Sequence, residues 1–349
     1  MNLLIITREV NVEDDILGFF VEWIKEFSKY FDRVFVITLA KGSYQLPENV
    51  FVYSLGKEKG NSKIAMAFSF YKYLFQLVPK SSGIFAHTSA TFVIASWPVA
   101  WMFRKKIILW YLHRSITVKL KIAEKLCYKI VTAAKESLVG FKSKKIIETG
   151  HGINTEEFRT DRNWTDGVVK ILSVGRISKI KDYETLLHAA KILKDKGINF
   201  NIEIVGRPVM PPDFPYFESL KLLKEKLNLG GAVRFVGFVP HNNIADYYKK
   251  SDIVIGLTPE GGIDKTILEA MASGCLTLTS NTINKKYFGN YADKLIFGYR
   301  ESGNLADKII SLNKLSLENK KEISDFLVQS VSENHKLQNL INKLYSLYV

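Results

Sequence analysis

The sequence predicts an α/β protein with two doubly wound parallel sheets, and three observations carry this prediction. The chain has 349 residues, which exceeds the size at which a single hydrophobic core usually keeps growing, so two domains are expected. Short apolar runs alternate with longer amphipathic ones in both halves, as in parallel strands joined by crossover helices. The polar segment 159–167 interrupts this alternation, which then resumes. We therefore expect two domains that face each other across a cleft, with ligands at the carboxyl ends of the strands.

The expected elements of the first half follow from its apolar runs and its amphipathic segments. Helices are expected at residues 19–31 and 62–77. Strands are expected at residues 3–7, 33–38, 51–54, 83–87, 106–111, 129–132 and 145–147.

The second half repeats the pattern after the polar segment. Strands are expected at residues 170–174, 201–205, 232–236, 253–257, 276–279 and 294–296. The helix expected over residues 182–196 carries a stripe of leucine and alanine and stops at Gly197, a typical C-terminal signal. The tail from residue 315 is helical in character, with a last helix over residues 336–348.

The composition favours anionic partners and a reducing compartment. Lys and Arg number 49 against 35 Asp and Glu, which leaves a formal charge of +14 and suits nucleotides, phospholipid headgroups or nucleic acid. Cys127 and Cys275 lie far apart without histidine companions, so neither a disulfide framework nor a zinc site is expected. The first residues suit a strand rather than a signal peptide. The most apolar stretch, residues 89–103, is short and contains Pro98, so no membrane span is expected.

Two segments of the second half indicate a site for a nucleotide diphosphate with an attached sugar. Gly261 and Gly262 let the backbone approach a ligand, and a helix starting near Asp264 would direct free N–H groups to the same place. Arg176 and Lys181, after the strand 170–174, offer a planar fork and a compact charge for phosphate oxygens. No Asp-x-Asp motif is present, and these cations would neutralise a diphosphate without a metal.

Glu269 lies further along the helix that starts near Asp264. Glu269 lies too far along this helix to contact a phosphate, but it is placed to accept hydrogen bonds from paired ribose hydroxyls. The neighbouring Ala270, Met271 and Ala272 indicate that this helix is buried, and a buried carboxylate needs a partner.

With these residues identified, the chain resembles the family 4 retaining glycosyltransferases, which have the GT-B fold of two Rossmann-like domains. The resemblance extends over nearly the whole chain. It rests on four strings in the order of the family: Gly-His-Gly-Ile-Asn-Thr-Glu-Glu-Phe at 150–158, Val-Gly-Arg-Ile-Ser-Lys-Ile-Lys at 174–181, Phe-Val-Gly-Phe-Val-Pro at 235–240 and Leu-Glu-Ala-Met-Ala-Ser-Gly-Cys at 268–275.

The sequence departs from the family at one position. The family usually has two glutamates separated by seven residues, but here Gly261 stands at the first position and Glu260 is displaced by one residue. The role of the first glutamate then passes to Glu260, to Asp264 or to nothing.

The resemblance implies a role for each candidate residue. Arg176, Lys181 and His113 would be catalytic, and Gly18 and His87 would contact the acceptor, whereas His241 is expected to be structural or solvated. The donor would be bound by Glu269, Glu260, Gly261, Gly262, Asp264, Lys265, Thr266, Gly237, Phe238 and Arg207.

The resemblance also implies the reaction and the domains. A sugar would pass with retention from a UDP or GDP type nucleotide sugar to a hydroxyl of a glycan or lipid-linked acceptor, without a metal or other cofactor. Residues 1–160 would bind the acceptor, residues 161–330 would bind the nucleotide sugar, and residues 331–349 would form a C-terminal helix that packs back on the first domain.

Other interpretations remain open. A nucleotide-sugar epimerase or a sugar phosphorylase has a similar fold. A nucleic-acid-binding protein would show clustered arginines and exposed stacking aromatics, whereas lysines dominate here and are spread along the chain. The aromatic helix around residues 68–77 either packs in the core with a basic outer face or docks on an anionic membrane. A cytoplasmic protein, peripheral on the inner face of the membrane, fits the second alternative.

Overall fold

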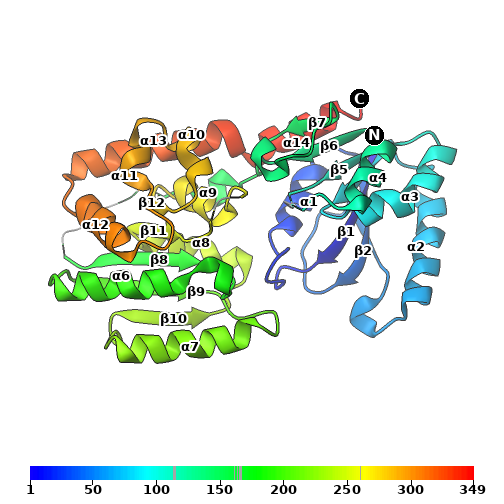
Figure 1. The fold of residues 1–349 in the computed structure, drawn as a ribbon. Helices are drawn as coiled ribbons and strands as arrows, with labels where there is room; N and C mark the ends of the chain where they lie inside the picture. The colour runs from blue at the N-terminus through cyan, green and yellow to red at the C-terminus, as the bar shows by residue number, and fades with distance from the viewer. Residues whose placement is uncertain (113–114, 161, 163, 165–166, 260) are drawn as a thin grey trace. The chain divides into compact units, whose positions relative to one another are not determined.

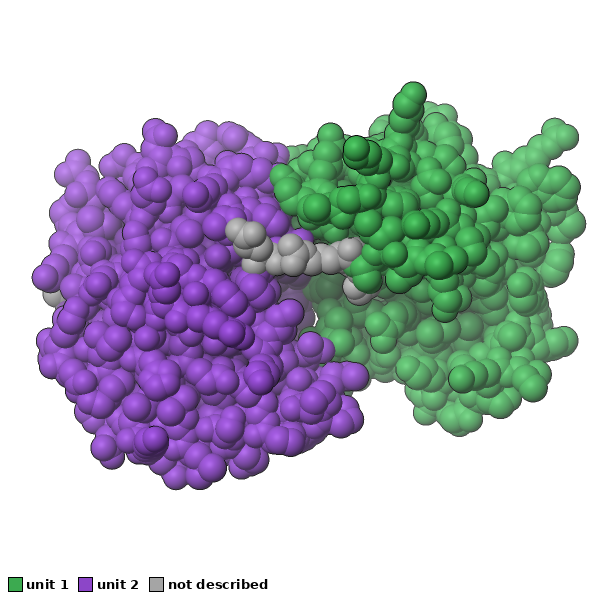
Figure 2. All heavy atoms as spheres, in the orientation of Figure 1, with its two compact units in different colours: residues 1–152, 335–349 green, residues 153–334 purple. Residues whose placement is uncertain are grey.

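The computed structural model describes residues 1–112, 115–160, 162, 164, 167–259 and 261–349. The chain divides into two compact units, coloured in Figure 2: unit 1 contains residues 1–152 and 335–349, and unit 2 contains residues 153–334. The division comes a few residues before the boundary expected after residue 160. The returning segment begins at His335 rather than at residue 331, because Ser324 and Ser330 donate hydrogen bonds to Gly274 O and Tyr287 O and so hold the preceding helix in unit 2.

Unit 1 is built on a seven-stranded parallel sheet with the order β3-β2-β1-β4-β5-β6-β7 (Figure 1). The strands are β1 (Asn2–Val10), β2 (Arg33–Lys41), β3 (Val50–Ser54), β4 (Gly83–His87), β5 (Lys106–Trp110), β6 (Lys129–Thr132) and β7 (Ile146–Glu148). Its helices are α1 (Phe20–Ser28), α2 (Lys63–Leu77), α3 (Ala90–Met102), α4 (Val118–Leu126) and α14 (Leu337–Ser346).

Alternate residues of the strands supply two cores, one on each face of this sheet. Leu4 and Ile6 of β1 pack on the side of α2, α3 and α4. Leu3 and Ile5 point to the other face, where α1 and α14 cover them. This alternation follows from the period of two along a strand, and both faces are apolar because a parallel sheet is covered on both sides.

Unit 2 has a five-stranded parallel sheet with the order β10-β9-β8-β11-β12. The strands are β8 (Val169–Val174), β9 (Phe200–Val205), β10 (Val233–Gly237), β11 (Ile253–Gly256) and β12 (Leu276–Thr279). The helices are α5 (Thr155–Phe158), α6 (Tyr183–Asp195), α7 (Asp213–Lys226), α8 (His241–Lys250), α9 (Lys265–Ala272), α10 (Lys285–Phe288), α11 (Ala292–Leu295), α12 (Ser302–Asn313) and α13 (Leu317–His335), the last of which ends on the first residue of the returning segment.

The strand expected at residues 294–296 is wrong. Most of this segment belongs to the short helix α11, and only Ile296 makes a parallel bridge, with Thr279 of β12. The N–H of Ile296 donates to Ala292 O at 2.9 Å, so the helical turn takes this donor before the sheet can use it. The apolar run of the expected strand is too short to replace the helical hydrogen bonds of the preceding turn.

Arg162 lies in the polar segment that precedes β8, and its guanidinium joins the ends of two helices. It donates to Tyr248 O at 2.7 Å and to Ser251 O, at the C-terminus of α8. It also donates to Ser273 O at 2.8 Å, at the C-terminus of α9. The last carbonyls of a helix carry its negative dipole end, so a cation there is favourable.

Within the described residues, no helix combines the length and the apolar character needed to cross a bilayer. Cys127 and Cys275 are both buried and free.

We predict that Leu340→Ala lowers the free energy of unfolding of unit 1 by about 2–5 kcal/mol. Leu340 of α14 is fully buried and lies against the place where Trp23 and Gly152 meet. Urea denaturation followed by tryptophan fluorescence reports on this core, since Trp23 and Trp110 belong to it. The exposed Lys343→Ala on the same helix serves as the control and should change the stability by less than about 0.5 kcal/mol. Equal stability of the two variants would contradict the packing of α14.

Candidate functional site

The second sheet places the candidate residues at one edge. Its strand order reverses between β8 and β11, and the loops after these two strands leave the sheet at the same carboxyl edge. In doubly wound folds this reversal opens the crevice in which ligands bind. The first loop carries Arg176 and Lys181, and the second leads from Thr258 to Asp264 at the start of α9.

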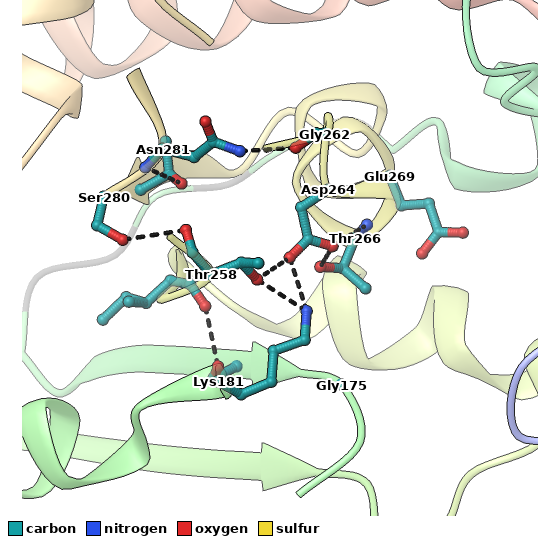
Figure 3. Close-up of polar contacts among 12 residues, drawn as sticks. Gly175, Lys181, Thr258, Gly262, Asp264, Thr266, Glu269, Ser280 and Asn281 are labelled. Atoms are coloured by element: carbon teal, nitrogen blue, oxygen red, sulfur yellow. Dashed lines mark hydrogen bonds and ion pairs between the residues drawn. The ribbon is translucent and has the colours of Figure 1, made fainter. Parts of the chain in front are cut away.

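Lys181 and Asp264 form the centre of this edge (Figure 3). The Lys181 ammonium lies 2.8 Å from Asp264 Oδ2 and 2.9 Å from Thr258 Oγ1. Thr258 Oγ1 in turn donates to Asp264 Oδ2 at 2.6 Å. The other oxygen of Asp264 accepts from the hydroxyl of Thr266 at 2.9 Å and caps α9. The two loops are therefore joined by one ion pair and its hydrogen bonds.

Asp264 already occupies the start of α9, where an open anion site was expected. Burial raises the pKa of its carboxyl, but the charge of Lys181 and the hydrogen bonds from Lys181, Thr258 and Thr266 lower it to about 2. The group is thus an anion at neutral pH. It neutralises part of the positive potential that the helix and Lys181 would otherwise offer to a phosphate.

Lys181 keeps the capacity to bind a further anion. An ammonium group has three N–H donors, and the bonds to Thr258 and Asp264 use two of them. Gly175 makes room for the side chain, because a Cβ at that position would lie 3.3 Å from Lys181 Cε. The side chain is 21% exposed, so its third donor is within reach of a ligand.

Arg176 lies at the carboxyl edge as expected, but its ionic partner is a protein carboxylate. Its Nε is 3.6 Å from Asp213 Oδ2 at the start of α7, and its side chain is 36% exposed. Ile177 N donates to Arg207 O at 3.0 Å, which ties the loop after β8 to the loop after β9. Arg207 stacks its guanidinium 4.5 Å from the ring of Phe238, which follows Gly237 of β10.

Glu269 lies between α8 and α9 and is only 3% exposed. Its Oε1 is 2.5 Å from Lys265 Nζ and 3.2 Å from His241 Nε2, while its Oε2 accepts from the Tyr248 hydroxyl at 3.0 Å. Burial raises the pKa of Glu269, but Lys265 and His241 lower it to about 2. The carboxylate expected to await a ribose is therefore already in contact with Lys265, His241 and Tyr248.

The turn before α9 is held by a residue of the next strand's loop. Asn281, which follows β12, donates from its side-chain amide to Gly262 O at 2.7 Å (Figure 3). This bond fixes the backbone just ahead of Asp264. Gly261 is buried in the same turn, and Glu260 lies outside the described residues.

The candidate residues of unit 1 have structural settings of their own. Gly18 is required by its loop, since a Cβ there would lie 2.8 Å from Val12 O. His87 is fully buried at the end of β4, where it stacks on Phe20 and lies 3.1 Å from the Thr7 hydroxyl. Burial lowers its pKa well below the usual range, with a smaller effect of Arg8. His87 is thus a neutral core residue in this structure, and its contact with an acceptor stays a prediction. His113 lies outside the described residues.

Sequence reasoning missed four side chains of the site. His241, expected to be structural or solvated, contacts Glu269 and Lys265, and Tyr248 bonds the same carboxylate. Thr258 and Asn281 hold the start of α9. Thr258 and Asn281 directly follow strands β11 and β12, and their positions at the carboxyl edge could have identified them. Nothing in the sequence signals the pairing of α8 with Glu269.

In the part of the chain that the structure describes, no group of three or more His, Cys, Asp or Glu side chains is arranged to hold a metal ion. The charged groups of the candidate site are instead balanced cations and carboxylates, as in Lys181 with Asp264 and Lys265 with Glu269.

The family model that matches this chain covers residues of unit 2. Residues 154–325 match the family model described as Glycosyl transferases group 1. An alpha-monoglucosyldiacylglycerol synthase of Streptococcus pneumoniae is 28% identical over 189 residues, which are 52% of this chain and 40% of that protein. The amylovoran biosynthesis glycosyltransferase AmsK of Erwinia amylovora is 30% identical over 149 residues, 41% of this chain and 35% of that protein. The chain thus spans less than half the length of these curated relatives.

A solved structure resembles the whole chain. Anabaena HepE in complex with UDP has a TM-score of 0.78 and 14% sequence identity, and the match covers 99% of each chain. At this identity the likeness establishes the fold alone. The expected fold class, GT-B with two doubly wound α/β domains, is confirmed.

We predict that acid destabilises unit 2 partly through Glu269. Its carboxyl has a pKa of about 2 in the folded chain against an ordinary value of 4.5. The unfolded chain therefore binds this proton first as the pH falls, and stability present above about pH 4.5 is lost toward pH 2. Glu269→Gln should weaken this dependence and cost on the order of 2 kcal/mol at neutral pH. Calorimetry across this pH range measures both effects.

The control is the exposed Glu218→Gln on α7, which should leave the pH dependence of stability unchanged. The same dependence in the wild type and in Glu269→Gln would contradict the assignment of the low pKa.

Proposed function

Because residues 154–325 match the group 1 glycosyl transferases, we propose that this chain transfers a sugar from a nucleotide-diphosphate sugar to an acceptor hydroxyl. One observation carries the choice of donor. The Lys181 ammonium is fixed at the reversal of strand order by Thr258 and Asp264, with a third N–H available to a phosphate oxygen. A nucleotide diphosphate has the charge and the oxygens that this donor requires.

Lys181 and Arg176 stabilise the leaving diphosphate in the proposed reaction. The bond between the anomeric carbon and the phosphate oxygen breaks, so negative charge develops on the diphosphate, and fixed cations at that place lower the barrier. Arg176 exchanges its partner Asp213, at 3.6 Å, for a phosphate oxygen. Asp213 is buried and also accepts from Met210 N–H at 2.9 Å, so its carboxylate keeps a protein hydrogen bond when Arg176 turns to the phosphate. The cations take the place of a metal ion, and metal independence is part of the proposal.

We propose transfer with retention at the anomeric carbon. The acceptor hydroxyl attacks from the face that the diphosphate leaves, its oxygen forms the new bond to the anomeric carbon, and a leaving phosphate oxygen takes its proton. No protein general base is assigned. The balanced charges around Lys181 and Asp264 favour such a mechanism, since they hold the leaving group without competing for the proton.

Glu269 offers a ribose fewer acceptor positions than a free carboxylate would. A carboxylate has about four acceptor positions. Lys265 and Tyr248 fill two of them, and His241 fills a third when its Nε2 carries a proton. One ribose hydroxyl can bond the remaining position on Oε2. A second requires one of the protein donors to move.

The acceptor is proposed to be a glycan or lipid-linked hydroxyl at the cytoplasmic side of a membrane. Two relatives support this class of acceptor by their names, one a synthase of a glucosyldiacylglycerol and the other a glycosyltransferase of amylovoran biosynthesis. The UDP complex of Anabaena HepE supports a UDP or GDP type of donor.

We predict that a matching nucleotide sugar raises the thermal midpoint of unit 2, because a ligand that binds only the folded state stabilises it. A thermal-shift screen against UDP, GDP and ADP sugars, with and without chelator, identifies the base and tests the need for a metal. With acceptor present, the nucleotide diphosphate should appear in step with the glycosylated product. An epimerase would change the sugar without releasing nucleotide, and a phosphorylase would not require nucleotide.

We predict that Lys181→Met lowers kcat/KM for transfer by about 10²–10³, the usual loss when one preorganised charge is removed. Steady-state kinetics with the donor found in the screen provide the measurement. Lys179→Met is the matched control, because Lys179 belongs to the same short 3-10 turn and is exposed. It should retain wild-type turnover.

Arg176→Ala should abolish transfer and leave the fold intact, as judged by an unchanged circular dichroism spectrum. Wild-type turnover in Arg176→Ala or in Lys181→Met would show that these cations do not hold the diphosphate.

A further inference from the structure

Helix α2 of unit 1 exposes an apolar stripe that its core contacts do not explain. Ile64, Phe68, Tyr71 and Phe75 lie at spacings of four, three and four residues, so they share one face of the helix. Their exposed fractions are 83%, 76%, 40% and 53%. The core of unit 1 takes the opposite side of the helix through Phe70, Leu74 and Leu77. A helix that only covers a sheet would carry polar residues on its outer side.

The two neighbouring helices of the same layer also expose large apolar side chains. Helices α2, α3 and α4 all pack on the same face of the first sheet, with α3 against both of the others (Figure 1). At the C-terminal end of α3, Trp101 and Met102 are 69% and 51% exposed, and on α4 Val118 and Ile122 are 73% and 42% exposed. These eight residues of α2, α3 and α4 are called the outer helical face below.

The outer helical face is cationic as well as apolar. The sequence contains no Asp or Glu between Glu58 and Glu124, a stretch that includes α2 and α3 whole and most of α4. Lysines and arginines of the same stretch stand exposed among the apolar side chains: Lys63 and Lys72 on α2, Arg104 after α3, and Lys119 and Lys121 on α4.

We propose that the outer helical face docks on the surface of an anionic phospholipid bilayer. Aromatic and aliphatic side chains enter the boundary between headgroups and acyl chains, while the surrounding cations meet the negative headgroups. Trp101 and Tyr71 are of the type enriched at such boundaries. A second copy of the same face would bring cations against cations, which disfavours self-association. A nucleic acid would leave Ile64, Met102 and Val118 without a partner.

This proposal does not depend on the proposed transfer reaction. All of its residues lie in unit 1, and docking requires neither donor nor acceptor. Vesicle binding and sugar transfer can therefore fail separately.

Co-sedimentation of the full-length protein with vesicles tests the proposal. The protein should bind vesicles of equimolar phosphatidylcholine and phosphatidylglycerol, bind them more weakly as salt rises, and bind vesicles of phosphatidylcholine alone at least tenfold more weakly. Brominated acyl chains should quench tryptophan fluorescence in the wild type, and Trp101→Phe should reduce this quenching.

Two pairs of substitutions test the two components of the face. Phe68→Ser with Phe75→Ser removes apolar anchors and should weaken binding by about tenfold or more. Lys72→Gln with Lys121→Gln should weaken it by about fivefold for each lysine. Because these side chains are exposed, the thermal midpoints should stay at the wild-type value.

Matched controls come from α7 and α8 of unit 2. Phe214→Ser with Leu222→Ser alters side chains that are 54% and 68% exposed, and Lys226→Gln with Lys250→Gln removes exposed charges of unit 2. Both control variants should bind vesicles as the wild type does.

Three results would overturn the proposal. The first is equal binding to neutral and anionic vesicles. The second is wild-type binding by both test pairs. The third is a dimer in sedimentation velocity that Phe68→Ser with Phe75→Ser dissociates, which would assign the face to a second copy of the chain.

Discussion

A carboxylate buried at the start of a helix must find a cation, and in unit 2 this requirement organises the whole carboxyl edge. Asp264 caps α9 and takes the ammonium of Lys181 from a loop on the neighbouring strand. The absence of a side chain at Gly175 leaves room for Lys181, and Thr258 completes the contact from the end of β11. The glycine, the lysine, the threonine and the aspartate thus form one unit, and the placement of each depends on the same ion pair.

The carboxylate of Glu269, further along α9, is also buried and also paired with a cation, but its partners are different. Glu269 is held by Lys265 on its own helix and by His241 and Tyr248 of α8. Both carboxylates of α9 are therefore satisfied by protein groups. A ligand in the proposed site would have to displace some of these protein partners, while the third donor of Lys181 is not used by its bonds to Thr258 and Asp264. Where partners are exchanged, the free energy of binding is a difference between two sets of hydrogen bonds.

Much of the fold could be predicted, because buried parallel strands appear as apolar runs and helices as amphipathic ones. The prediction of a strand at residues 294–296 was wrong because the Ile296 N–H donates to Ala292 O and continues a helical turn. In the site, Arg176, Lys181 and Asp264 were recognisable from their position after strands. The burial of His87 on Phe20 and the contact of His241 with Glu269 depend on packing between distant segments, which local sequence does not encode.

Arg162 connects the polar segment before β8 to the C-terminal end of α9. Its guanidinium bonds the carbonyl of Ser273, where α9 ends, whereas Lys181 and Asp264 meet where α9 begins. Helix α9 has 8 residues and is rigid over its length of about 12 Å. Both ends of this short helix are thus held by cations from outside it, the first turn through Asp264 and Lys181 and the last carbonyl by Arg162.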